Sequence, residues 1–259
     1  MTKERLDILL ANRGLAESRA LTQRLIMAGQ VRVRGQVVDK PSAKVEETAE
    51  ISLDRGPRYV SRGGEKLEGA LRSFNIERVD GLVCADIGAS TGGFTDCLLQ
   101  HGAARVYSID VGYGILHWKL RQDSRVVSME RSNARYIAAL PEIVQLVVVD
   151  ASFISLNILL PVFKHWYGPQ GGQALALIKP QFEAGREEAA HGAGVIRDPE
   201  VHRKVILEVL QDACAEGFGA LGLARSPLVG PKGNAEFLVR LEYPGTAQIP
   251  LDVVESVLI

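Results

Sequence analysis

Four polar residues of this 259-residue chain stand where side chains could do chemistry, beside the ends of predicted strands. Lys66 follows a Gly-Gly turn, Asp150 and Lys179 each end an apolar run, and Glu236 begins the last predicted strand. A lysine directly after the buried run ALALI is unusual, because lysine is rarely buried without a partner. Any one of the four alone would be interpreted as a strand-end side chain that reaches solvent. Together, at the ligand-binding edge of one sheet, they indicate a functional site.

A glycine-rich turn marks a second candidate site. The segment DIGASTGGF, residues 86–94, joins a predicted strand to a helix, and its glycines let the backbone approach a ligand closely. The next predicted strand ends at Asp110, and an acidic residue there suits two ribose hydroxyls. This layout is typical of an S-adenosylmethionine site. The turn does not match GxGxxG, and the chain has no GxxxxGK followed by Ser or Thr, so dinucleotide and triphosphate sites are disfavoured. A tight turn in any α/β fold stays the simpler alternative.

The elements that must position these residues alternate between strand and helix. We expect five apolar strands, at residues 82–88, 105–110, 125–130, 145–152 and 174–181. Helical stretches fit at residues 154–166 and 199–217, and residues 220–227 and 235–243 are expected to pair as an antiparallel hairpin at the sheet edge. Short apolar strands that alternate with helices predict an α/β fold with a Rossmann-like, doubly wound sheet.

The N-terminal segment has a different character. Residues 1–34 hold seven Lys or Arg against three Asp or Glu, a net charge of +4, although the whole chain carries −1. We predict helices at residues 5–14 and 18–29, the second capped by Ser18, and a hairpin at residues 31–39 that places Arg32 and Arg34 on one strand face. A basic module of this kind often binds a polyanion, although a solvated helix face gives the same count.

Gly56, Pro57, Gly63 and Gly64 indicate a linker after this module. We therefore expect three parts, listed by range: a small α+β RNA-binding domain at residues 1–58, a linker at 59–65 and the Rossmann-like domain at 66–259.

Composition excludes several classes of protein. With 30 Lys and Arg, 31 Asp and Glu and 46% hydrophobic residues, the chain is not disordered. No run approaches the ~18 apolar residues of a membrane helix, and the N-terminus does not read as a signal peptide. Cys84, Cys97 and Cys214 are isolated, and the histidines show no metal-ligand spacing. We expect a cytoplasmic protein that has no membrane partner and requires no metal.

Residues 3–53 resemble the alpha-L RNA-binding module of a small-subunit ribosomal protein, pseudouridine synthases and tyrosyl-tRNA synthetases. The segments GLAESR, LIMAGQVRVRG and VVDKPS carry the match. The resemblance implies binding to structured RNA, where shape and backbone contacts dominate. Arginine suits forked contacts to phosphate, and the candidate RNA contacts are Arg5, Arg19, Arg24, Arg32 and Arg34.

The remainder resembles the TlyA family of FtsJ-like ribose methyltransferases, through YVSRGGEKL, DIGASTGGFTD, DVGYG, VVVDASFISL, IKPQFE and GPKGNAEF. The resemblance implies a catalytic tetrad of Lys66, Asp150, Lys179 and Glu236. Lys179 is then the candidate base that removes the proton of a ribose 2′-hydroxyl as it attacks the methyl group of a sulfonium ion. Lysine acts as a base only when neutral, a form that burial or a nearby cation such as Lys66 favours. Asp150 and Glu236 would orient the two lysines.

The same resemblance implies S-adenosylmethionine as cofactor and ribosomal RNA, free or in ribosomal subunits, as partner. The methionine end of S-adenosylmethionine would be lined by Asp86, Gly88, Ser90, Gly92, Gly93 and Phe94. Asp110 would hold the ribose, and Asn133 would lie near the adenine. Ile115 stands where relatives usually carry Gln, so no role is transferred to that turn. Residues 191–202 are interpreted as a mobile loop, where Arg186, Arg197 and His202 are RNA contacts or merely solvated charges.

The function expected is 2′-O-methylation of cytidine in large-subunit rRNA, and in some family members small-subunit rRNA too. A hemolysin would need a signal segment, an amphipathic hairpin or an apolar span, and none is visible in the sequence. An RNA-binding or ribosome-assembly factor without catalysis is a second alternative, which the intact tetrad disfavours. Methylation of transfer RNA or messenger RNA caps is a third, because the same tetrad serves several ribose methyltransferases.

Overall fold

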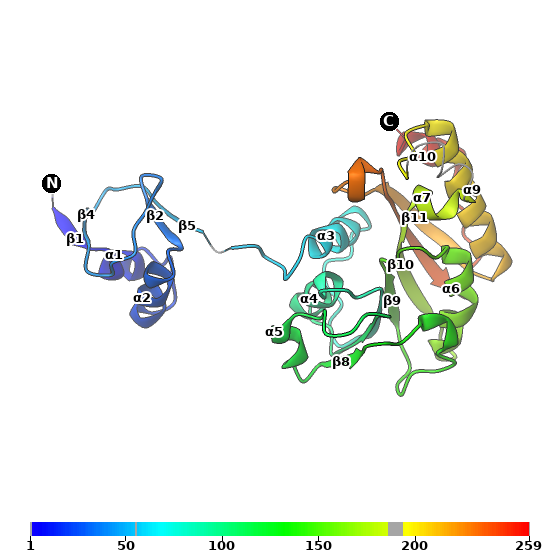
Figure 1. Cartoon of the computed structure of the whole chain (residues 1–259), viewed down its shortest axis with the longest axis horizontal. Coiled ribbons are helices and arrows are strands. Elements are labelled where there is room, and N and C mark those ends of the chain that lie inside the picture. Colours follow the sequence, from blue (N-terminus) through cyan, green and yellow to red (C-terminus); the bar gives the residue numbers. More distant parts are fainter. Residues whose placement is uncertain (1, 55, 186–193, 259) are drawn as a thin grey trace. The chain divides into compact units, whose positions relative to one another are not determined.

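The computed structural model describes residues 2–54, 56–185 and 194–258. It divides the chain into two compact units, Met1–Arg58 and Tyr59–Ile259. Figure 1 shows the elements of both units.

The first unit packs two short helices with small antiparallel sheets. Its elements are β1 (Lys3–Arg5), α1 (Leu6–Asn12), α2 (Arg19–Met27), β2 (Val31–Val33), β3 (Gln36–Val37), β4 (Lys44–Glu46) and β5 (Ile51–Leu53). The predicted cap of α2 is confirmed, because the Ser18 hydroxyl accepts a hydrogen bond from the Leu21 amide at 3.2 Å. Strand β2 lies between β3 and β5, and β1 pairs with β4. Leu6, Leu10, Ile26 and Val31 form a fully buried core.

A buried carboxylate joins the two helices of this unit. Asp7 of α1 accepts hydrogen bonds from Arg5, from Arg19 at 3.0 Å and from Gln23 at 2.9 Å. The side chain of Asp7 is 0% exposed. The hydrogen bonds from Arg5 hold the pKa of Asp7 well below its ordinary value, and those from Gln23 and Arg19 act in the same direction against the effect of burial.

The hairpin after α2 is confirmed, but one detail of it is wrong. Strand β2 ends at Val33, and Arg34 (φ 51°) and Gly35 (φ 80°) form the turn. Arg34 therefore does not share a strand face with Arg32, because the chain reverses direction at that residue. Alternating polar and apolar residues do not show where a strand stops.

The described residues of the second unit form a seven-stranded sheet in the order β11-β12-β10-β9-β6-β7-β8. Five consecutive strands of this sheet run parallel to one another: β6 (Val83–Ile87), β7 (Arg105–Ile109), β8 (Val126–Met129), β9 (Leu146–Val149) and β10 (Gly172–Ile178). The predicted edge hairpin is β11 (Gly219–Arg225) and β12 (Phe237–Tyr243), and β12 is antiparallel to both neighbours. The five strands and the hairpin were therefore predicted correctly.

The helices of this unit are α3 (Gly63–Ser73), α4 (Gly93–Gln100), α5 (Trp118–Arg121), α6 (Leu156–Phe163), α7 (Pro180–Glu183), α9 (Pro199–Ala215) and α10 (Leu251–Ser256). The described residues of this unit also form single turns of 3₁₀-helix at Ala134–Tyr136, Lys164–Trp166 and Pro231–Gly233. Among the residues described, no helix is long and apolar enough to cross a membrane.

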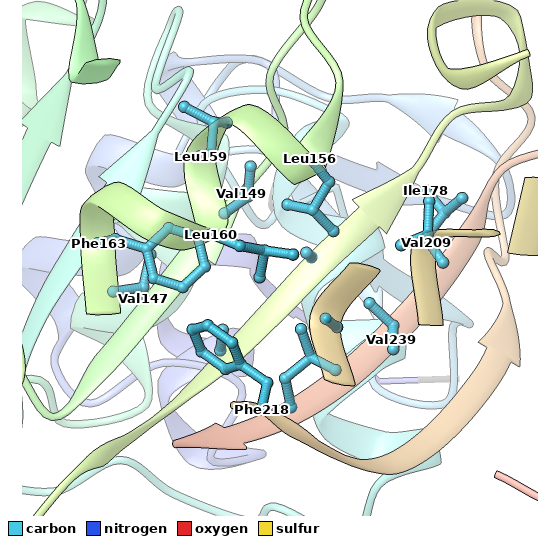
Figure 2. Packing of buried hydrophobic residues seen from close by; sticks show 14 of the residues in the cluster. Val147, Val149, Leu156, Leu159, Leu160, Phe163, Ile178, Val209, Phe218 and Val239 are labelled. Carbon is cyan, nitrogen blue, oxygen red and sulfur yellow. The ribbon is translucent and has the colours of Figure 1, made fainter. Parts of the chain in front are cut away.

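Helices cover both faces of the sheet, α6, α9 and α10 on one face and α3, α4 and α5 on the other (Figure 1). Val147 and Val149 of β9 belong to the first layer, whereas Leu146 and Val148 belong to the second. Figure 2 shows Val147 and Val149 among the apolar side chains of the first layer. A strand buried on both faces reads as a continuous apolar run, which explains why these strands were visible in the sequence.

The segment expected to be a linker, residues 59–65, belongs to the second unit in the structure. Tyr59 is 2% exposed, the Val60 amide donates to Asp96 of α4 at 2.9 Å, and α3 begins at Gly63. A Cβ on Gly64 would lie 2.2 Å from the Tyr59 ring. Gly64 therefore permits close packing rather than flexibility.

The packing of α3 against α4 gives a test of this interpretation. A Cβ on Gly93 would lie 2.7 Å from the Gly64 amide nitrogen, whereas a Cβ on Gly63 would meet nothing closer than 3.5 Å. We expect Gly93→Ala to lower the free energy of unfolding by about 1–3 kcal/mol, because backbone must move to make room. Gly63→Ala is the matched control and should stay within about 0.5 kcal/mol of the unsubstituted protein. Urea unfolding measures both; equal stability of the two variants would contradict the prediction.

Candidate active site

The four polar residues singled out in the sequence form one chain of ion pairs. Asp150 Oδ1 lies 2.5 Å from Lys179 Nζ, and Asp150 Oδ2 lies 3.8 Å from Lys66 Nζ. Lys66 Nζ in turn donates a hydrogen bond to Glu236 Oε2 at 2.6 Å. Two ammonium groups therefore share the carboxylate of Asp150, and a second carboxylate holds one of them from the other side.

Sheet topology explains why these distant residues meet. Asp150 directly follows β9 and Lys179 directly follows β10, so both lie at the carboxyl edge of the parallel strands. Glu236 directly precedes β12, and because β12 is antiparallel its first residue, Phe237, pairs with Ile178 at the same edge. Lys66 lies on α3, which packs on the face of the sheet that α4 and α5 also cover.

The cluster is largely withdrawn from water. The side chains of Lys179 and Glu236 are 7% and 0% exposed, and those of Lys66 and Asp150 are 13% and 20% exposed. Buried charges are costly unless they are paired, and these four pair with one another. Lys179 Nζ also donates to the Asp150 carbonyl and the Ser152 hydroxyl, each at 3.3 Å.

Two cavities meet at this cluster. The first, of about 640 Å³, is lined by Lys66 and Asp150 together with Ser61, Arg62 and residues 228–232. The second, of about 430 Å³, is lined by Asp110, Asn133, Ile115, Ala134 and neighbouring residues. Gly88, Ser90 and Asp150 line both cavities, so a ligand in one would reach a ligand in the other at Asp150.

The glycine-rich loop forms the wall between the cavities. Gly88 has φ 82°, and a Cβ there would lie 2.8 Å from the Asp150 carbonyl oxygen. The loop after β6 can thus pass directly against the backbone that carries Asp150. Ser90, with φ 50°, donates its amide to Asp110 Oδ2 at 2.8 Å. The other Asp110 oxygen accepts the Gly112 amide at 2.7 Å, which fixes this carboxylate beside the second cavity.

The structure places the predicted cofactor residues in three positions. Gly93 and Phe94 line the first cavity, and Gly88, Ser90, Asp110 and Asn133 line the second. Asp86 and Gly92 line neither of these two cavities. Asp86 is 0% exposed and accepts the Thr95 hydroxyl at 2.6 Å, and a Cβ on Gly92 would lie 2.2 Å from Leu120.

The five arginines predicted to bind RNA all lie in the first unit and reach solvent. The side chains of Arg5 and Arg19 remain 42% and 54% exposed although both are held by Asp7. Arg32 lies 3.7 Å from Asp54, Arg34 pairs with Glu46, and Arg24 is exposed near the end of α2.

Of the three residues considered as RNA contacts in the loop before α9, one is corrected. His202 is 7% exposed, with Nε2 3.0 Å from the Ile196 carbonyl, so it is a packing residue of α9. Arg197 is exposed. Arg186 and residues 191–193 lie outside the described part of the chain.

Sequence reasoning missed two features beside the tetrad. Phe153 is 89% exposed, and its ring lies 4.8 Å from that of Phe182. Glu183 accepts a hydrogen bond from the Leu156 amide at 2.9 Å and another from the Ser155 hydroxyl, and its burial raises its pKa. Glu183 thereby caps α6 and ties the loop after β9 to α7, the helix that follows β10. The segments SFISL and IKPQFE contain these residues, but nothing in either segment distinguishes them.

In the sheet, the antiparallel strand β12 lies between β10 and β11. This strand order and the glycine-rich loop together define a Rossmann-like methyltransferase fold. The FtsJ-like methyltransferase family matches residues 59–243, and the S4 domain family matches residues 4–51. The chain therefore belongs to the FtsJ-like methyltransferases and carries an S4 domain at its N-terminal side.

Named relatives extend over almost the whole chain. A Bacillus subtilis protein provisionally named rRNA methyltransferase YqxC is 48% identical over 95% of this chain and 88% of its own. The Mycobacterium tuberculosis protein named 16S/23S rRNA (cytidine-2′-O)-methyltransferase TlyA is 44% identical over 92% of this chain and 90% of its own. A solved structure from Streptococcus thermophilus that bears a hemolysin name is 45% identical, covers 100% of this chain and 95% of its own, and has a TM-score of 0.73. The resemblance to the TlyA family is thus confirmed.

The buried carboxylate behind the glycine-rich loop gives a pH test. Burial raises the pKa of Asp86 to about 7, against about 3.9 for an aspartate in an unfolded chain. Between these values the folded state holds one more proton than the unfolded state, so this group makes stability fall as pH rises from about 4 to about 7. Urea unfolding from pH 5 to 8 should show a smaller fall for Asp86→Asn. Identical pH dependence in both proteins would contradict the prediction.

Proposed function

We propose that this protein transfers a methyl group from S-adenosylmethionine to the 2′-hydroxyl of a cytidine in large-subunit rRNA, and that small-subunit rRNA is a second substrate. The observation that carries the proposal is the pair of lysines on Asp150, where the two cavities meet. The relative from M. tuberculosis supports the choice of substrate, since its name specifies cytidine in both rRNAs.

The second cavity suits S-adenosylmethionine. The Asp110 carboxylate, fixed by two backbone amides, retains lone pairs that can accept both ribose hydroxyls. Val111, Ile115 and Ala134 supply apolar walls for an adenine, and Asn133 adds a polar group beside them. When bound, the cofactor supplies an electrophilic methyl group on a sulfonium ion. Asp150, which lines both cavities, provides a negative charge near that cation.

Lys179 is the base of the proposed reaction. Its neutral amine would take the proton of the ribose hydroxyl as that oxygen gains the methyl group, while the methyl–sulfur bond breaks and the cofactor would leave as a neutral thioether. Asp150, whose Oδ1 lies 2.5 Å from Lys179 Nζ, would stabilise the ammonium so formed. Lys66, held by Glu236, places a second cation on Asp150 and so weakens the attraction of that carboxylate for Lys179. Positioning of the two reactants contributes up to ~7–11 kcal/mol in such reactions.

No step of this mechanism needs a metal ion. Within the described ranges, no three or more His, Cys, Asp or Glu side chains gather as a metal site.

The S4 domain docks the enzyme on folded rRNA, free or in a ribosomal subunit, through its exposed arginines. Such a substrate places the protein in the cytoplasm. The proposed RNA-binding domain spans residues 1–58 and the methyltransferase domain the residues from 59 onward.

Lys179→Ala tests the assignment of the base. We expect methyl transfer to fall by about 10²–10⁴-fold, the usual contribution of a general base, while cofactor affinity stays unchanged. Lys204→Ala is the matched control, because Lys204 is a lysine on α9 that is 65% exposed and pairs only loosely with Glu208. The assay offers methyl-labelled S-adenosylmethionine with large subunits, small subunits and stripped rRNA, and calorimetry measures cofactor binding. Full activity of Lys179→Ala would rule out this residue as the base.

The same assay separates the alternatives. Label in an alkali-resistant dinucleotide demonstrates methylation of the ribose, and the labelled particle identifies the subunit. Absence of both label and cofactor binding would instead favour an RNA-binding or assembly factor. Label in transfer RNA but in neither rRNA would overturn the proposed substrate.

A further inference from the structure

Exposed aromatic side chains gather at one edge of the sheet. The chain has seven Phe, six Tyr and two Trp, and the large exposed rings among them are Tyr113, Trp118, Tyr136 and Phe153, at 65% to 89% exposure. All four lie on segments that follow β7, β8 or β9 at their carboxyl ends. Aromatic rings usually bury most of their surface, so their concentration at this edge indicates a surface that binds something.

Two of these rings, those of Tyr113 and Tyr136, are accompanied by arginines. The Arg131 guanidinium lies 4.1 Å from the centre of the Tyr113 ring, and that of Arg135 lies 5.4 Å from the centre of the Tyr136 ring. Trp118 begins α5, which like Tyr113 follows β7 in the chain. We call Tyr113, Trp118, Arg131, Arg135 and Tyr136 the aromatic rim.

The rim is preformed. Arg131 has φ 51°, a backbone conformation that residues other than glycine rarely adopt. Its amide donates to the Gly112 carbonyl at 2.9 Å, and the Ser132 amide donates to the Asp110 carbonyl at 2.9 Å. These bonds tie the loop after β8 to the loop after β7. Backbone strain retained in a hydrogen-bonded loop is a common feature of functional sites.

Charge identifies the kind of partner. Among the described residues, neither Arg131 nor Arg135 forms an ion pair with a carboxylate, whereas neighbouring Arg121 and Arg125 pair with Glu130 and Asp123. The rim thus offers two uncompensated positive charges beside exposed rings. Proteins that bind single-stranded nucleic acid combine these two features: bases stack on the rings and phosphates meet the cations. An apolar peptide would use the rings and leave the charges without partners.

We propose that the aromatic rim binds an unpaired stretch of the RNA substrate next to the nucleotide that is methylated. Arg135 and Ala134 line the second cavity, so RNA on the rim lies directly beside the proposed cofactor site. Stacking of bases here would hold the target strand open and separate from the structured RNA bound by the S4 domain. The inference rests on the proposed function only in taking RNA as the substrate.

Binding to a short oligonucleotide tests the rim in the full-length protein. The probe is a fluorescent 12-nucleotide oligouridylate that carries 5-bromouridine. We expect Trp118→Ala and Tyr136→Ala each to weaken its binding about 5- to 150-fold, the usual effect of losing one stacked base. Tyr136→Phe should bind normally, because it retains the ring. The double change Arg131→Ala with Arg135→Ala should lower the salt dependence of oligonucleotide affinity by the amount that corresponds to losing about one to two phosphate contacts.

Matched controls remove similar side chains from other surfaces. Ile143→Ala loses an apolar side chain that is 56% exposed, and Lys204→Ala loses an exposed cation; both should bind the oligonucleotide normally. If the rim variants bind it as the controls do, the proposal is wrong. If they lose S-adenosylmethionine affinity by the same factor as oligonucleotide affinity, the rim belongs to the cofactor site and the proposal also fails.

Photo-cross-linking distinguishes this proposal from the proposed function. Bromouridine bound on the rim should cross-link to the peptides that contain Tyr113, Trp118 or Tyr136, as identified by mass spectrometry. Such cross-links together with no methylation of either rRNA would support the rim and overturn the proposed function. Methylation of rRNA with cross-links confined to residues 2–54 would do the reverse.

Discussion

One carboxylate that holds two ammonium groups organises the second unit of this protein. Asp150 lies 2.5 Å from Lys179 and 3.8 Å from Lys66, in a place where unpaired charges would each cost several kcal/mol. None of these groups is stable there alone, so they must arrive together. Glu236 completes the set, because it neutralises the second lysine at 2.6 Å. The sheet, the glycine-rich loop and α3 can all be understood as the means of bringing these four charges to one point.

Glycine serves close contact rather than freedom of movement at the positions that matter most. Gly88 lets the loop after β6 pass against the Asp150 backbone, and Gly93 lets α4 approach α3. Gly64 lets α3 pack closely against the Tyr59 ring. Lys66 projects from α3, so its distance from Asp150 depends on that approach. A side chain at any of these positions would therefore disturb the ion pairs without contacting a charged atom.

Much of the fold could be predicted from the sequence because the strands are buried on both faces and read as apolar runs. Asp150 and Lys179 could be singled out from the same feature, since they are polar residues at the ends of such runs. Their grouping with Lys66 and Glu236 as a tetrad came from the resemblance to the TlyA family. Other details depend on three-dimensional contacts. Asp86 also ends an apolar run, but its side chain turns inward to Thr95. Gly63 and Gly64 resemble a linker until Tyr59 is known to be buried against Gly64. The sequence alone does not show whether an aromatic residue such as Tyr136 is exposed or buried.

The position of β12 between β10 and β11 has a consequence for how the protein is made. Strand β10 leaves the ribosome long before β12, and until β12 arrives β10 is an unpaired edge of apolar residues, a known risk for aggregation. The same late strand delivers Glu236, so Lys66 lacks its closest partner during that interval. Completion of the sheet and assembly of the charged cluster therefore both wait for β12. A chain that stops before β12 would therefore lack both the complete sheet and the complete charged cluster.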